Sequence, residues 1–118
     1  MNLFLTWILL SLFAETKETP TPVATFSIAA MDPDTGEIGV AVQSKIVAVG
    51  AVVPWAKANV GAVATQSFAN VTYGKEGLRL LEMGKNPEEV VKSLTRKDPK
   101  KDLRQVGILS ANGKAFHF

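Results

Sequence analysis

Thr25 is the residue whose setting in the sequence points most directly to chemistry. It opens a segment, Thr25–Ala30, in which residue types alternate as they do in a half-buried strand. A threonine at the N-terminus of a processed chain can act as a nucleophile, with its own α-amine as the general base. The unperturbed α-amine pKa of about 7.7–8.0 suits proton transfer near neutral pH. Thr25 is therefore a candidate nucleophile, although a threonine at the start of a strand is also common in proteins without catalytic function.

A tight turn and a second strand must position any partners of Thr25. Asp32–Gly36 combines Asp, Pro and Gly in an order that is typical of turns. Ile38–Val42 is small and apolar, which predicts a second strand that is covered on both faces. Two strands around a short turn form a hairpin, and pairing of Met31 with Ile38 would fix its register.

That register brings polar side chains to Thr25. Antiparallel pairing places Thr25 opposite Ser44, with Gln43 and Lys45 beside it. Lys45 could lower the pKa of the amine or stabilise an oxyanion, and nearby backbone N–H groups could also stabilise the oxyanion. The candidate catalytic residues are therefore Thr25, Gln43, Ser44 and Lys45.

Composition excludes several other kinds of chemistry. The chain of 118 residues has no cysteine, which rules out disulfides, thiolate zinc sites, iron–sulfur clusters and a cysteine nucleophile. Its one histidine, His117, cannot form a multi-histidine metal site. A net charge of +2 is too weak to indicate a nucleic-acid partner. Because the sequence also has no glycine motif of the kind that cradles phosphates, we expect no metal, no cofactor and no nucleic acid.

The first 24 residues are interpreted as a signal peptide and a spacer. Leu3–Phe13 is almost purely apolar, too short to span a membrane but of the length found in secretory signal peptides. A buried strand or a docked helix is the alternative interpretation. Cleavage after Ala24 would make Thr25 the N-terminus, whereas cleavage after Ala14 would leave Thr25 without its own amine. In both cases we expect a secreted or periplasmic protein without stable membrane insertion after processing.

The remaining sequence predicts two helices and three further strands, so that the chain holds about five strands in all. The expected elements are a strand over Val60–Gln66 after a connection that contains Pro54, a helix over Lys75–Met83 that ends at Gly84, a helix that Asn86 caps and Asp98-Pro99 ends, a strand over Gln105–Leu109, and a returning strand from Lys114. These elements make half of a layered α+β domain, and the sequence ends inside the last strand. We therefore expect a truncated domain or a fragment.

Three other features have two interpretations each. The polar run Thr65–Asn70 follows a predicted buried strand, where it could contact a substrate or form an ordinary exit from the strand. Trp55 could stack on a ligand or belong to the core. The basic stretch between Lys92 and Arg104 is expected to line a solvated helix end rather than a nucleic-acid site.

Four blocks of the sequence resemble one known family. They read ATFSIAAMDPDTGEIGVAVQSK, VGAVVPWAKANVGAVATQSFAN, YGKEGLRLL and RQVGILSANGKA, in this order between Ala24 and Phe118. The family is number 1028 of the domains of unknown function, and it resembles a branch of the N-terminal-nucleophile (Ntn) hydrolases. The resemblance implies a four-layer αββα sandwich, of which residues 25–118 would be the N-terminal half.

The same resemblance gives Thr25 a role. In Ntn hydrolases the nucleophile is the first residue of the mature chain, a position that Thr25 matches. Val40–Lys45 is also similar to the second strand of proteasome subunits, which reads V-A-V-D-S-R, with Gln43 at the acidic position and Lys45 at the arginine. Lys57 lies closer in the sequence than Lys45 does to the position of the catalytic lysine in those subunits.

We therefore expect an exported Ntn-type amidohydrolase that cleaves the amide C–N bond of a small-molecule or peptide-like substrate through Thr25. An alternative of another class is a non-catalytic exported binding module on the same scaffold, which the neutral Gln43 favours. Some relatives carry an added peptidoglycan-binding module, which implies cell-wall material as the ligand. Self-association into a homo-oligomer is left open.

Overall fold

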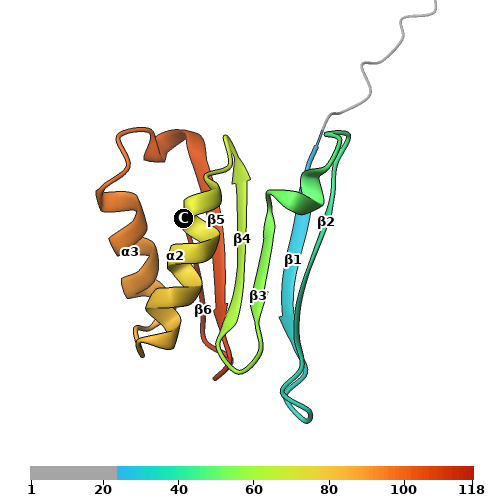
Figure 1. Cartoon of the computed structure of the whole chain (residues 1–118), viewed down its shortest axis with the longest axis vertical. Coiled ribbons are helices and arrows are strands. Elements are labelled where there is room, and N and C mark those ends of the chain that lie inside the picture. The colour runs from blue at the N-terminus through green and yellow to red at the C-terminus, as the bar shows by residue number, and fades with distance from the viewer. Residues whose placement is uncertain (1–23) are drawn as a thin grey trace, which may run out of the picture.

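The computed structural model describes residues 24–118, which form a mixed α+β fold with two sheets and two α-helices (Figure 1). The predicted α+β class is confirmed at this level. The signal peptide and spacer were predicted for a segment that lies, except for Ala24, outside the described residues. None of the helices in the described part of the chain has the length and apolar character needed to span a membrane.

The first two strands form a hairpin with the predicted register. β1 (Phe26–Met31) and β2 (Ile38–Gln43) pair antiparallel, with Met31 opposite Ile38. In the turn between them, Asp32 Oδ1 accepts hydrogen bonds from two backbone N–H groups at 2.8 and 3.2 Å. These bonds lower the pKa of the Asp32 carboxyl. The turn is thus held by a side chain that the sequence supplies locally, and this is why its register could be predicted.

The second sheet has four antiparallel strands in the order β3-β4-β5-β6. They are β3 (Pro54–Lys57), β4 (Gly61–Ser67), β5 (Arg104–Ser110) and β6 (Ala115–His117). Three of these strands confirm the prediction, but the expected connection at Pro54 is wrong. Pro54 begins an edge strand, the position in a sheet where the missing N–H of a proline is tolerated. The described residues therefore hold six strands rather than five.

The two α-helices lie between β4 and β5 in the chain. α2 (Val71–Glu82) begins before the predicted Lys75, because Asn70 caps it by accepting a hydrogen bond from a backbone N–H at 3.1 Å. It ends as predicted, with Gly84 in the left-handed region at φ +86°. α3 (Pro87–Arg96) begins at the predicted cap.

Asn86 is expected to contribute measurably to stability through the cap of α3. Its side chain accepts from the N–H of Glu89 at 3.0 Å, and the Glu89 carboxylate accepts from the N–H of Asn86 at 3.1 Å. Asn86→Ala should lower the free energy of unfolding by about 1 kcal/mol in urea denaturation, because it removes one acceptor of this reciprocal cap. Asn86→Ser keeps an acceptor and should stay within a few tenths of a kcal/mol of wild type. Equal losses in both variants would contradict the capping argument.

The elements stack in three layers. Both helices cover one face of the four-stranded sheet, and the β1–β2 sheet lies against the opposite face, next to β3 and β4 (Figure 1). The main hydrophobic core lies between the helices and the four-stranded sheet. Its buried members are Val63, Tyr73, Leu80, Leu81, Val90, Val91, Leu94, Val106 and Ile108.

The outer face of the β1–β2 sheet is exposed, although β2 was predicted to be covered on both faces. Alternate residues of the hairpin face the four-stranded sheet, but Phe26 and Ile28 point the other way and are 65% and 51% exposed. Gly39 and Ala41 on β2 share this exposed face. The prediction that β2 is covered on both faces is therefore wrong for the described residues, because both helices pack on the other sheet.

Candidate functional site

The hairpin brings Thr25 and Ser44 together, as the predicted register requires. Thr25 immediately precedes β1 and Ser44 immediately follows β2. Their hydroxyl oxygens, Oγ1 and Oγ, lie 2.9 Å apart in a hydrogen bond that either side can donate. Ser44 Oγ also accepts from the N–H of Ile46 at 3.1 Å. The Thr25 side chain is half-buried, so its hydroxyl is both oriented and accessible.

The other two predicted partners, Gln43 and Lys45, make no hydrogen bond to Thr25 within residues 24–118. Gln43 pairs with Phe26 and lies with it on the exposed face of the hairpin. Lys45 is exposed beyond the end of β2. Neither side chain makes a hydrogen bond within residues 24–118. Lys57 is engaged elsewhere, since its Nζ lies 2.6 Å from Glu82 Oε1 on α2.

A groove of about 590 Å³ opens beside Thr25. The connection after β2 supplies an aliphatic wall, formed by Ile46, Val49, Val52 and Val53. The end of β4 and the start of β5 supply the opposite side. That side consists of Gln66, Ser67, Phe68, Ala69, Arg104 and Gln105. Hydroxyl and amide side chains therefore face aliphatic ones, and Arg104 is the one charged lining residue among the described residues.

Gln66 joins the groove to the hairpin. Its Nε2 donates a hydrogen bond to Ser27 Oγ, which ties the two sheets together beside Thr25. The sequence predicts the polar run Thr65–Asn70 as a candidate contact region, and Gln66 is the member that bridges the sheets. Ser27 was not identified, although a strand places residues i and i+2 on one face. That spacing alone indicates that Ser27 shares the face of Thr25.

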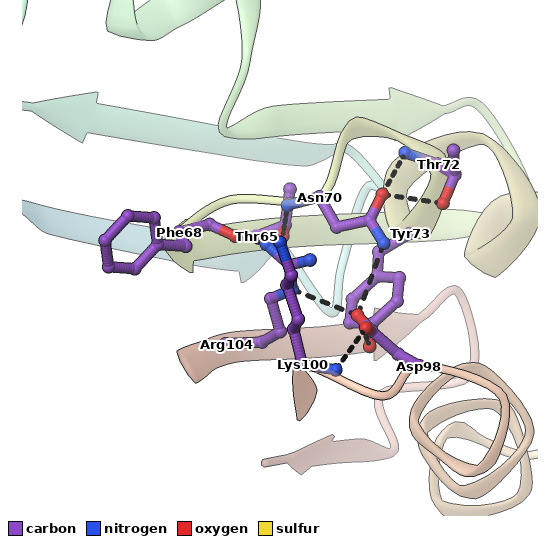
Figure 2. A network of polar contacts seen from close by, with 8 residues as sticks. All are labelled: Thr65, Phe68, Asn70, Thr72, Tyr73, Asp98, Lys100 and Arg104. Atoms are coloured by element: carbon purple, nitrogen blue, oxygen red, sulfur yellow. Dashed lines mark hydrogen bonds and ion pairs between the residues drawn. The ribbon is translucent and has the colours of Figure 1, made fainter. Parts of the chain in front are cut away.

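A second cluster, drawn in Figure 2, centres on Asp98. The Asp98 carboxylate accepts hydrogen bonds from Tyr73 Oη at 2.8 Å, Arg104 Nε at 3.0 Å and the backbone N–H of Lys100 at 2.8 Å. Asn70 Nδ2 adds a longer contact of 3.4 Å. The backbone N–H of Lys100, followed by the Arg104 guanidinium, holds the pKa of Asp98 well below its usual range.

Tyr73 is the buried member of this cluster. Burial raises the pKa of its phenol to about 12, and the hydrogen bond to the Asp98 carboxylate adds to the shift. Both groups therefore keep their charge states across the whole neutral range, with Asp98 ionised and Tyr73 neutral. The cluster is suited to holding structure rather than to exchanging protons near pH 7.

Arg104 connects the Asp98 cluster to the groove. Its Nη1 donates to the backbone carbonyl of Phe68 while its Nε binds Asp98 (Figure 2). The sequence prediction placed Arg104 in a solvated basic stretch, and for this residue it is wrong. Its side chain is 15% exposed, because it lies across the exit of β4 with a carboxylate on one side and a carbonyl on the other.

Trp55 and His117 do not line the groove beside Thr25. Trp55 packs against the core, and its Nε1 donates to the carbonyl of Val52 at 2.9 Å. His117 is exposed on β6. Within residues 24–118, no three His, Asp or Glu side chains are grouped so that they could hold a metal ion.

Comparison with known proteins places the chain in a family. Residues 25–118 match the family described as a family of unknown function (DUF1028). The crystal structure of protein SPO2555 from Silicibacter pomeroyi, a DUF1028 protein, is similar with a TM-score of 0.77 and 36% sequence identity. The match covers 80% of this chain and 44% of that one. No curated protein matches the chain. The chain belongs to the DUF1028 family.

Proposed function

We propose that this chain carries the nucleophile of an Ntn-type amidohydrolase, with Thr25 as the attacking residue. The observation that carries the proposal is the position of Thr25 at the start of β1, beside a groove and 2.9 Å from Ser44. The family match begins at Thr25, which supports a mature domain that starts there. A threonine in this position needs neither histidine nor cysteine for catalysis.

The proposed reaction uses the amine and the hydroxyl of one residue. The α-amine of Thr25 takes the hydroxyl proton as Oγ1 attacks the amide carbon and forms a tetrahedral intermediate. The protonated α-amine then delivers the proton to the leaving nitrogen, and the C–N bond breaks to leave an acyl ester on Oγ1. Water, activated by the same amine, hydrolyses this ester. Ser44 holds the attacking hydroxyl in place through its 2.9 Å hydrogen bond.

The residues that line the groove favour a neutral, peptide-like substrate. Its aliphatic wall suits an apolar side chain, and the amides of Gln66 and Gln105 can both donate to and accept from a peptide group. The charge of Arg104 is balanced by Asp98. An exported, secreted or periplasmic enzyme with such a groove would meet the peptide portion of cell-wall material.

The proposal includes a larger fold. In a four-layer αββα sandwich a second layer of helices covers the outer face of the β1–β2 sheet. The exposure of Phe26 and Ile28 on that face supports this arrangement. The match to this chain covers 44% of the solved relative, which supports the assignment of the chain to one half of the domain.

A non-catalytic exported binding module is the second candidate. It is favoured by Gln43, which lies with Phe26 on the exposed face of the hairpin, and by Lys45, which is exposed and makes no hydrogen bond to Thr25 within residues 24–118. The groove would then bind peptide-like material without cleaving it. The identity of the mature N-terminus separates the two candidates.

The mature N-terminus is expected to be Thr25, and only that form should react. The full chain would be expressed with its leader, and the product analysed by intact mass and N-terminal sequencing. A chain released from a fusion at Thr25 should be acylated by a p-nitrophenyl ester and should hydrolyse N-acetyl-amino-acid p-nitroanilides. The matched control begins one residue earlier, at Ala24, and should do neither because its Thr25 has no free amine. A native N-terminus at residue 15, or equal reactivity of the two forms, would favour the binding module.

A further inference from the structure

The exit of β4 is held in an unfavourable backbone conformation beside the candidate nucleophile. Ser67, the last residue of β4, has φ +64°, in the left-handed region that residues with a Cβ rarely adopt. It begins the turn Ser67–Ala69, which lines the same groove as Thr25. Non-glycine residues in this region persist only where their surroundings fix them, and they concentrate at functional sites.

Both backbone and side-chain contacts hold this turn. The N–H of Phe68 donates to the carbonyl of Leu103 at 3.1 Å, and the N–H of Ala69 donates back to Ser67 at 2.8 Å. The N–H of Asn70 reaches Thr65 Oγ1 at 3.3 Å. The carbonyl of Phe68 accepts a hydrogen bond from the Arg104 side chain. Because the peptide group is planar, a fixed carbonyl also fixes the N–H on its other side.

Arg104 is placed to act on this turn. It is the first residue of β5 and pairs directly with Ser67 across the sheet. Its planar guanidinium uses Nη1 on the Phe68 carbonyl and Nε on Asp98. A lysine presents a single nitrogen and cannot hold both acceptors in one plane.

Asp98 in turn anchors Arg104 to the rigid part of the domain. Its carboxylate is bound by Tyr73 near the start of α2 and by the backbone of Lys100 after α3. The orientation of Arg104 is therefore set by both helices, which pack on the core. The path runs from the core through Tyr73, Asp98 and Arg104 to the Phe68 carbonyl (Figure 2).

We propose that Arg104, clamped by Asp98, is a positioning residue that holds the Ser67–Ala69 turn as the fixed wall of the Thr25 groove. Arg104 acts through the Phe68 carbonyl and takes no part in bond making. This inference rests on the proposed function for its catalytic consequence. The geometry of the turn can be tested without any activity.

The first test measures hydrogen exchange across the turn. Arg104→Gln should raise the exchange of the peptide that covers residues 66–70 by about tenfold or more, because the turn loses its side-chain restraint. α2, α3 and β5 should keep wild-type protection. Arg104→Lys should behave like Arg104→Gln, since it cannot hold both acceptors. Arg79→Gln is the matched control, because Arg79 pairs with Glu76 on the exposed side of α2. Unchanged exchange in the turn, or loss of protection throughout the domain, would overturn the proposal.

The second test asks whether the contact between Asp98 and Tyr73 stays intact when the turn loses its hydrogen bond from Arg104. The chain has one tyrosine, so the absorbance of its phenolate reports Tyr73 alone. The wild-type midpoint should lie at about 12. The neutral phenol is the form that the fold favours, so its contribution to stability is complete below pH 10 and is lost as the pH rises through 12.

The two variants should move this midpoint in opposite directions. Asp98→Asn removes the carboxylate that raises the pKa of Tyr73, while burial remains, so the midpoint should fall but stay above 10. Arg104→Gln removes a positive charge that lowers the pKa of Tyr73, so the midpoint should rise. A fall in Arg104→Gln would show that the whole cluster had opened. Arg104 would then be structural only, and the proposal would be wrong.

The catalytic consequence is tested in the chain that begins at Thr25. With an N-acetyl-amino-acid p-nitroanilide, Arg104→Gln should lower kcat/KM by about 10²-fold, because a displaced wall misplaces the substrate. Arg79→Gln should leave kcat/KM unchanged. If the unsubstituted chain does not react, the proposed function fails while the exchange and titration results still decide the role of Arg104. If it reacts and Arg104→Gln reacts equally well, the positioning role fails alone.

Discussion

Gly74→Ala is expected to destabilise the domain by about 3 kcal/mol, the upper end of what overpacking a core costs. A Cβ built on Gly74 would lie 2.2–2.3 Å from three atoms of the Trp55 ring. At these distances either α2 or the ring must move. Equilibrium urea denaturation of the variant and of wild type would give the difference directly.

The Trp55 ring has little freedom to retreat. Its Nε1 donates to the carbonyl of Val52 at 2.9 Å, and the indole packs against the buried cluster under α2. The backbone of the helix therefore lies directly on an aromatic ring that the sheet holds in place. Glycine is required at this position because of close approach, not because of an unusual φ.

Gly77→Ala on the same helix is the matched control. Its Cβ would lie 3.1 Å from Val63 Cγ2 and 3.7 Å from its next neighbours, so a shift of a few tenths of an ångström accommodates it. Alanine also improves helix propensity by about 1 kcal/mol over glycine. The two effects should nearly cancel and leave Gly77→Ala within about 1 kcal/mol of wild type. Equal destabilisation by the two substitutions would show that the contact with Trp55 is not the cause.

The elements that could be predicted are those with local causes. The hairpin register follows from a turn that Asp32 holds with its own side chain. The start of α3 follows from a cap whose two members are three residues apart, and the end of α2 follows from Gly84. In each case the residues that decide the structure are neighbours in the sequence, so no knowledge of the packing is required.

What could not be predicted depends on packing between distant segments. Pro54 carries a strong signal against a strand, and only pairing with β4 makes β3 an edge strand. The early start of α2 is hidden by its two glycines, which lower helix propensity but fit against Trp55 and Val63. The exposure of Phe26 and Ile28 reverses the burial that their types favour, because both helices lie on the other sheet.

In the candidate site, too, the contacts with local causes could be predicted and those between distant segments could not. The contact between Thr25 and Ser44 follows from the hairpin register. The separation of Gln43 from Thr25 was also available from the sequence, since a strand alternates its faces and Gln43 pairs with Phe26. The contribution of Arg104 was not available. Its contact with Phe68 joins residues that are 36 positions apart in the sequence. Its other partner, Asp98, lies with it in a stretch whose charges alone indicate exposure to solvent.

Thr25→Ala, in the chain that begins at residue 25, is expected to lower amide hydrolysis by about 10³-fold or more, as removal of a catalytic nucleophile does in hydrolases. The substitution removes Oγ1, the atom that would form the acyl ester, and leaves the α-amine in place. p-Nitroanilide release would measure hydrolysis. Intact mass after treatment with a p-nitrophenyl ester would show whether an acyl group remains on the chain.

The fold should survive this substitution. Thr25 is half-buried and its side chain makes one hydrogen bond within residues 24–118, to Ser44, so Thr25→Ala should cost about 1 kcal/mol of stability. Far-ultraviolet circular dichroism and the urea midpoint would check this. Thr25→Ser keeps both the hydroxyl and the amine and should retain most of the acylation that Thr25→Ala loses.

Ser44→Ala distinguishes a nucleophile from its support. It removes the hydrogen bond that orients Thr25 but leaves Oγ1, so its expected loss is about tenfold, in proportion to a single neutral hydrogen bond. If Ser44→Ala abolishes acylation while Thr25→Ala retains it, the nucleophile is the serine and no N-terminal amine is needed. If neither substitution changes the rate, the observed hydrolysis does not use this hydroxyl pair. The groove would then be a binding surface, and Gln66 and Gln105 would be the residues whose loss weakens it.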